Sequence, residues 1–245
     1  QIIDVDMLQN ILNDIFLIAD EADSIHEKLI LRMIKKSMYY CIDHLFRLNM
    51  FTKQIFEFGY IAKLSFILKT MAAQFRLFTV QHDDQNATDH KAEMSVFEVL
   101  FDPILEAFPM ITSRIDDEML LKDSKTKLSQ LLLQILEIAK LHDNYLRIMK
   151  EKNEAQENKE EVDEDHDQMC CIMSCIWCVL VKYGESVRKQ VVSDKDMMML
   201  IEQKWASQAN IVTQQHAKQL LQILKNEEIC NMICTHPDKV DTDVM

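Results

Sequence analysis

Apolar residues recur every three or four positions along most of the chain, which is the spacing of one face of an α-helix. The pattern begins with Leu8, Ile11, Leu12, Ile15 and Ala19. It predicts further helices over residues 26–48, 52–79, 94–115 and 125–139, a short helical run after a turn near 142–144, and three more runs beyond residue 167. Several of these helices are apolar on two sides, so we expect them to be packed between neighbours.

Two polar segments interrupt the helical pattern. Residues 81–93 and the acidic stretch 151–167 lack apolar periodicity, and both are expected to be flexible loops. Pro103 and Pro109 are expected to mark helix breaks or first turns, because proline has no N–H to donate.

Composition strengthens the helical prediction and removes several functions. The 245 residues include only 2 glycines and 3 prolines, too few for the turns of a β or α/β fold. Gly59 and Gly184 lie far apart, so neither a dinucleotide-binding loop nor a phosphate-binding loop can be assembled. We therefore predict an all-α protein. Because the first residue is Gln1, we expect the sequence to be a segment of a larger protein.

The charge and the cysteines suggest where the chain works. A net charge of −13 argues against direct nucleic-acid binding. The longest apolar run, residues 169–181, is too short to cross a bilayer, so no membrane span is expected. An odd number of cysteines, 7, does not resemble the disulfide framework of a secreted domain. We expect a cytoplasmic or nuclear protein.

Cys170, Cys171, Cys175 and Cys178 fall within nine residues. Three of them, at 171, 175 and 178, share one helix face, so we interpret the run as the packed spine of a helix. A metal or redox site remains the alternative, since Cys175 and Cys178 have C-x-x-C spacing. No catalytic set of residues can be nominated, and we expect no enzyme activity, no cofactor and no metal.

Three stretches share an order of elements, namely a long apolar helix, a polar joint and an R/K-x-x-I/V step. The joints read LNMFTKQI, LHDNYLRI and YGESVRKQV. This order resembles the armadillo repeat, in which a long third helix ends in a turn and the next repeat opens with a short helix. Gly59 lies where that family places a glycine, whereas Lys195 and Asp196 replace it at the third joint. The resemblance implies a right-handed α-solenoid over residues 1–245 as one domain.

In armadillo-like solenoids the third helices line a groove that binds a partner. On this resemblance Tyr40 falls where the family has a groove tryptophan, and His44 where it has an asparagine. The same offset gives Leu133 and Glu137 in the second unit. In the third unit it is ambiguous between Ile176 and Trp177.

The function expected from this resemblance is that of an intracellular scaffold or adaptor that binds a peptide or helical segment of another protein. The chain lacks an asparagine ladder, so a helix lying in the groove is at least as plausible as an extended basic peptide. An all-helical enzyme or ligand-binding domain with an apolar pocket is the alternative.

Overall fold

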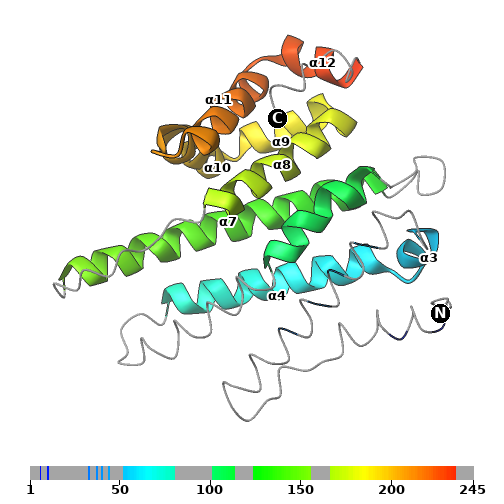
Figure 1. Cartoon of the computed structure of the whole chain (residues 1–245), viewed down its shortest axis with the longest axis horizontal. Coiled ribbons are helices and arrows are strands. Elements are labelled where there is room, and N and C mark those ends of the chain that lie inside the picture. Colours follow the sequence, from blue (N-terminus) through cyan, green and yellow to red (C-terminus); the bar gives the residue numbers. More distant parts are fainter. Residues whose placement is uncertain are drawn as a thin grey trace.

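The computed structural model describes residues 52–80, 101–113, 124–155 and 166–235, together with six single residues before position 50: Asp6, Asn10, Met33, Ser37, Tyr40 and His44. Every regular element in these ranges is helical and none is a strand, which confirms the all-α prediction (Figure 1). Within the same ranges, no helix combines the length and the apolar character needed to cross a lipid bilayer.

The first helices described form a turn around Gly59. Helix α3 (Thr52–Glu57) ends just before Gly59, and α4 (Tyr60–Val80) starts just after it. Gly59 has φ 76°, a left-handed conformation that glycine adopts without the steric cost of a side chain. The helix that the apolar pattern predicted over residues 52–79 is therefore divided at Gly59, whereas the second half of the predicted joint LNMFTKQI, from Thr52 on, is helical.

The long helix α7 (Ser124–Ala155) lies against α4, and the two run in the same direction (Figure 1). Near the start of both helices, the Gln134 amide donates to Ser65 Oγ at 2.9 Å. Further along both, the rings of Phe75 and His142 meet edge to face at 5.9 Å. Because residue numbers increase in the same direction along both helices at these two contacts, α4 and α7 are parallel.

The sequence analysis expected a turn near residues 142–144 and the joint LHDNYLRI in this region. Both predictions are wrong, because α7 is one unbroken helix of 32 residues. No glycine or proline interrupts it. The polar residues at the expected turn instead make contacts along the helix and with its neighbour: Arg147 donates to Asn144 at 2.8 Å and to Glu151 at 3.0 Å, and Asp143 pairs with Lys204 of a later element. Polarity in this stretch marks a partly exposed helix surface and not a turn.

The expected loop boundaries also change. Helix α7 continues to Ala155 and α8 (His166–Tyr183) already begins at His166, so both ends of the segment 151–167 are helical. The remaining residues 156–165, like the predicted loop at 81–93, lie outside the described residues.

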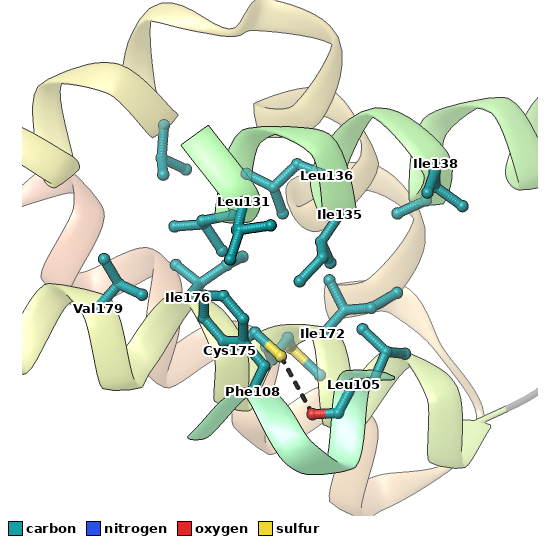
Figure 2. Packing of buried hydrophobic residues seen from close by; sticks show 14 of the residues in the cluster. Leu105, Phe108, Leu131, Ile135, Leu136, Ile138, Ile172, Cys175, Ile176 and Val179 are labelled. Carbon is teal, nitrogen blue, oxygen red and sulfur yellow. Dashed lines mark hydrogen bonds between the residues drawn. The ribbon is translucent and has the colours of Figure 1, made fainter. Parts of the chain in front are cut away.

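Residues 101–113 form a helix that runs alongside α8, again in parallel. Asp102 accepts from Gln168 at 3.0 Å, Leu105 from Cys175 at 3.5 Å, and the carbonyl of Thr112 from Lys182 at 3.0 Å. Pro103 lies within these helical residues, and the start of the helix falls outside the described residues. Pro109, however, does not break the helix. Its missing N–H frees the carbonyl of Leu105, and the Cys175 thiol points at that oxygen (Figure 2).

The C-terminal part is a series of shorter helices joined by tight turns. They are α9 (Glu185–Ser193), α10 (Lys195–Met199), the π-helix η1 (Leu200–Lys204), the 3₁₀ turn η2 (Trp205–Ser207), α11 (Ile211–Lys225) and α12 (Glu227–Thr235). Side-chain oxygens of Asp194, Asn210 and Asn226 accept from the first amide groups of α10, α11 and α12. Asp and Asn favour such helix starts because they satisfy otherwise unpaired donors.

Two ion pairs hold α10 and η1 against α7. Lys140 bonds Asp194 and Lys204 bonds Asp143, each at 2.5 Å. Asp194 and Lys204 follow each other in the same order as their partners on α7, so α10 and η1 run parallel to α7. The described helices therefore form two sets of parallel neighbours: α4, α7 and α10–η1 in one set, and residues 101–113, α8 and α11 in the other.

The hydrophobic core lies between these sets (Figure 2). Leu131, Ile135 and Ile138 of α7 face Ile172, Ile176 and Val179 of α8, and all six are at most 2% exposed. The cysteine run is in the same helix, as predicted. Cys175 is fully buried, while its three neighbours in the run are partly buried. Of the methionines that follow, Met197 is in the core and Met199 is 53% exposed.

Candidate functional site

The feature that most resembles a binding site is a groove between α8 and α11. These two helices run in the same direction. Cys170 Sγ lies 3.6 Å from Thr213 Oγ1 near their starts. Near their ends, the carbonyl of Leu224 accepts a 2.7 Å bond from Arg188, just beyond α8. The sequence offset at the first contact is 43 residues.

A pocket of about 120 Å³ lies in this groove, and we call it the α8/α11 pocket. Its walls are Met173, Ser174, Trp177, Cys178, His216, Gln219 and Leu220. The indole of Trp177, the thioether of Met173 and the leucine supply apolar surface. His216, Gln219 and Ser174 add polar groups, and none of the lining residues is an Asp, Glu, Lys or Arg. The pocket is thus largely apolar and bordered by hydrogen-bonding side chains.

The two residues that the sequence left open in α8 have different surroundings. Ile176 is fully buried among the core residues of α7 and α8. Trp177 is half-buried and lines the α8/α11 pocket. The difference of one residue turns a side chain by about 100° around the helix, which moves it from the core to the groove.

Leu133 and Glu137 do not join Trp177. Both are on α7, which belongs to the other set of parallel helices. Leu133 is 37% exposed, and Glu137 forms an ion pair with Arg76 of α4. The sequence analysis assigned α7 a role equivalent to that of α8 because it predicted a turn within α7. That turn is absent. These two residues therefore lie outside the α8/α11 pocket.

Glu137 lines a second and larger cavity, of about 430 Å³, between α7 and α10–η1. Its other walls are Lys140, Leu141, Asp143, Asn144, Asp196 and Leu200. The charged groups here largely neutralise one another, since Lys140 pairs with Asp194 and Asp143 with Lys204. We interpret this cavity as part of the contact between α7 and α10.

Tyr40 and His44 are helical and exposed, and Tyr40 retains 38% of its surface. The residues around both side chains lie outside the described ranges, so their position relative to α8 and α11 is not part of the described structure.

The thiols near the pocket are neutral. Burial raises the pKa of Cys178, and burial with the neighbouring Cys178 and Cys171 thiols raises the pKa of Cys175 well above its ordinary value. A thiol acts as a nucleophile or metal ligand in its deprotonated form, so a raised pKa opposes both roles. Across the ranges the structure describes, no three His, Cys, Asp or Glu side chains are grouped to hold a metal ion.

His216 and Gln219 were missed by the sequence analysis. The periodicity of α11 does show that they share a helix face with Val212, because positions i, i+4 and i+7 align. What the sequence lacks is any sign that this face adjoins α8. Residues 43 positions apart meet only through tertiary packing.

Comparisons with known proteins found no similar protein, so the site is interpreted from its geometry. The chain matches no protein-family model, no curated protein and no solved structure.

Proposed function

We propose that this chain is a protein–protein interaction module that holds a segment of a partner in the groove between α8 and α11. The observation that carries the proposal is the α8/α11 pocket, a largely apolar recess between two parallel helices, with Trp177 in its wall. Tryptophan is one of the residue types enriched among those that dominate the energy of protein interfaces.

The arrangement of the helices supports a solenoid as the scaffold for this groove. Repeat proteins stack equivalent helices in parallel, at sequence offsets set by the repeat length. The offset of 43 residues between α8 and α11 falls in the range of armadillo and HEAT repeats, about 40–47 residues, whereas contacts between α4 and α7 and between residues 101–113 and α8 join residues 61 to 70 positions apart. The two parallel sets would then be the two helical layers of the solenoid, and residues 101–113 and α11 would flank α8 in the groove layer.

Binding rather than catalysis is the function that these features support. The raised pKa of Cys178 keeps its thiol protonated, which makes it a poor nucleophile. Six thiols of the described residues are free, which supports a reducing compartment such as the cytosol or nucleus.

Site-specific photo-crosslinking tests the proposal. A photoreactive amino acid is placed at exposed Ser174, on the rim of the pocket, and at exposed Phe66 on α4 as the control. We expect position 174 to capture a discrete protein from cell extract that position 66 does not capture. Trp177→Ala should weaken that capture without unfolding the chain, as checked by its denaturant midpoint.

The ligand-binding alternative gives a different result. If the pocket serves a small apolar molecule, native mass spectrometry of the purified chain will show a bound mass, and the crosslinker at position 174 will capture no protein. That pair of results would contradict the proposed function.

A further inference from the structure

A small cavity lies where the two sets of parallel helices meet. Its walls come from α7, α8 and the residues that join η1 to η2, and we call it the α7/α8/η2 cavity. Its polar lining residues are His142, Asp143, Gln168, Lys204 and Trp205. We infer that this cavity binds one ordered water molecule, which accepts a hydrogen bond from the indole N–H of Trp205. The inference does not depend on the function proposed for the α8/α11 pocket.

The size of the cavity fits a single water molecule. Its volume is about 20 Å³, counted as the space open to the centre of a water-sized sphere. By that measure a cavity needs about 10–15 Å³ to hold one water. The α8/α11 pocket is larger, at about 120 Å³. An organic ligand of several non-hydrogen atoms therefore does not fit between α7, α8 and η2 without displacing side chains.

Trp205 supplies the group that needs a partner. The residue is 2% exposed, and its indole N–H donates to none of the residues that the structure describes. The nitrogen is not among the fully enclosed polar atoms, so it borders open space, and the α7/α8/η2 cavity is the space that Trp205 lines. An indole has one donor and no acceptor, and a buried donor left unpaired is destabilising. A water in the cavity provides the acceptor.

Other side chains complete the hydrogen bonds of this water. The Asp143 carboxylate accepts from Lys204 through Oδ1 at 2.5 Å, and its second oxygen is a further acceptor. The side-chain carbonyl of Gln168 and the ring of His142 add two more polar groups to the lining. A buried water typically makes about three hydrogen bonds. One accepted from Trp205 and two donated to these groups satisfy that number.

The charges around the cavity favour a neutral occupant. Asp143 and Lys204 form an ion pair, and Gln168 and Trp205 are uncharged. A cation in the cavity would be repelled by the Lys204 ammonium, and an anion would be repelled by the Asp143 carboxylate. Water both donates and accepts, so it suits a lining that contains both kinds of group.

Apolar side chains form the remaining walls. Ala139, Met169 and Ile172 are at most 8% exposed, and Leu146 is half-buried. None of them offers a hydrogen bond, so the water is held on the polar side of the cavity. Surrounded in this way, it should exchange with solvent more slowly than water on the surface.

The water would also help to fix the approach to α11. The carbonyl of Trp205 accepts from the Gln208 amide at 3.3 Å, and the carbonyl of Gln208 accepts from the Gln214 side chain of α11 at 3.3 Å. The orientation of the indole is therefore linked through two hydrogen bonds to the first turn of α11. One water at the α7/α8/η2 cavity would connect both parallel sets to that turn.

Contacts between water and the indole protons test the inference. The chain contains two tryptophans, Trp177 and Trp205, so the ¹⁵N-labelled full chain gives two indole signals, which Trp177→Phe and Trp205→Phe assign. We expect the Trp205 indole proton to show a nuclear Overhauser effect to water with the sign of a contact that outlasts molecular tumbling. Trp177, which is half-buried in the larger pocket, should show only the weak effect of rapidly exchanging water. The absence of a long-lived effect at Trp205 would overturn the inference.

Two alanine substitutions locate the contact. Ala139 lines the cavity and is 5% exposed, so the added methyl groups of Ala139→Val fill the space and should abolish the effect at Trp205. Ala72→Val is the control, because Ala72 on α4 is similarly buried, at 3%, and does not line the cavity. It should leave the effect unchanged. An effect that persists in Ala139→Val would place the water elsewhere and contradict the inference.

A crystal structure of the unsubstituted chain gives a second measurement that requires no variant to fold. We expect one water oxygen about 2.7–3.2 Å from Nε1 of Trp205, with a second polar partner in the lining. Crystals grown in bromide distinguish a water from an anion, because bromide scatters anomalously. An unoccupied cavity, an indole N–H bonded directly to a protein acceptor, or a bromide peak at the site would each show the inference to be wrong.

Discussion

The thiol of Cys175 on α8 points at the main-chain carbonyl of Leu105, with 3.5 Å between sulfur and oxygen. That carbonyl is the one left without an intrahelical partner by Pro109, four residues later. Cys175 is fully buried, and burial is the main reason that its pKa lies well above the ordinary value. The protonated thiol is therefore a weak donor directed at a carbonyl that its own helix cannot satisfy.

This relationship predicts an energetic coupling between Cys175 and Pro109. Cys175→Ala should destabilise the chain by about 1–3 kcal/mol, since it removes buried volume and leaves the Leu105 carbonyl unpaired. In a Pro109→Ala background residue 109 regains an N–H, so the same change should cost about 1 kcal/mol less. Urea unfolding of the four proteins measures the coupling. Costs that add within about 0.3 kcal/mol would show that the contact has no energetic weight.

The two glycines provide a matched pair for the next prediction. Both have positive φ, 76° at Gly59 and 58° at Gly184. A Cβ at position 59 meets nothing within 4 Å, whereas at position 184 it would lie 2.9 Å from Cys234 Sγ. Gly59→Ala should cost about 1–2 kcal/mol from backbone strain alone, and Gly184→Ala about 1–3 kcal/mol more.

Thermal or urea unfolding of both glycine variants checks this difference. Cys234→Ala removes the sulfur and should abolish the excess cost of Gly184→Ala while leaving Gly59→Ala unchanged. If the two glycine variants prove equally stable, α12 does not pack against the α8–α9 turn as described.

The continuity of α7 predicts the effect of a proline. Asn144→Pro places proline in the interior of a 32-residue helix and should destabilise the chain by about 3 kcal/mol or more. Asn144→Ala, the control, should change stability by only about 0.5 kcal/mol. Circular dichroism measures the helix content of both variants, and urea unfolding measures their stability. A well-tolerated proline would instead favour a turn at this position.

The stability of the α7–α10 contact should depend on pH through Asp194. Burial raises the pKa of this carboxyl, but the Lys140 ammonium and the amide groups of Met197 and Asp196 outweigh it, so the pKa lies below 3.8. A lowered pKa means that the stabilisation is complete above the unfolded pKa and is lost as the pH falls through the folded value. The affected window is therefore below about pH 4.

Two substitutions separate the roles of Asp194. Asp194→Asn keeps an acceptor for the Met197 amide at 3.0 Å but removes the charge that pairs with Lys140. It should be less stable than the wild type at pH 7, and the difference should shrink towards about pH 2. Asp194→Ala should lose a further 0.5–2 kcal/mol, approximately, at every pH because it also lacks the cap. A difference independent of pH in the Asn variant would exclude the ion pair as its cause.

Local interactions made much of this architecture readable from the sequence. The apolar spacing of α4, α8 and α11 identified them as helices, because a helix with a buried face repeats apolar residues with a period of about 3.6 residues. The joint YGESVRKQV identified the turn at Gly184, and the resemblance to armadillo repeats gave Gly59 a special place; both have a positive φ, which favours a residue without a side chain. The cysteine run was recognised as part of a helix for the same reason of spacing.

Tertiary structure decided the features that rest on distant partners. Pro109 lies within a helix, and Cys175, 66 positions later in the chain, faces the carbonyl that the proline frees. The polar stretch around Asp143 is helical in part because Lys204 pairs with it. Trp177 joins His216 in one pocket, while Glu137 turns to Arg76, because α7 and α8 belong to different parallel sets. Such contacts depend on which helix faces meet in space, and helical periodicity specifies the faces without specifying their partners.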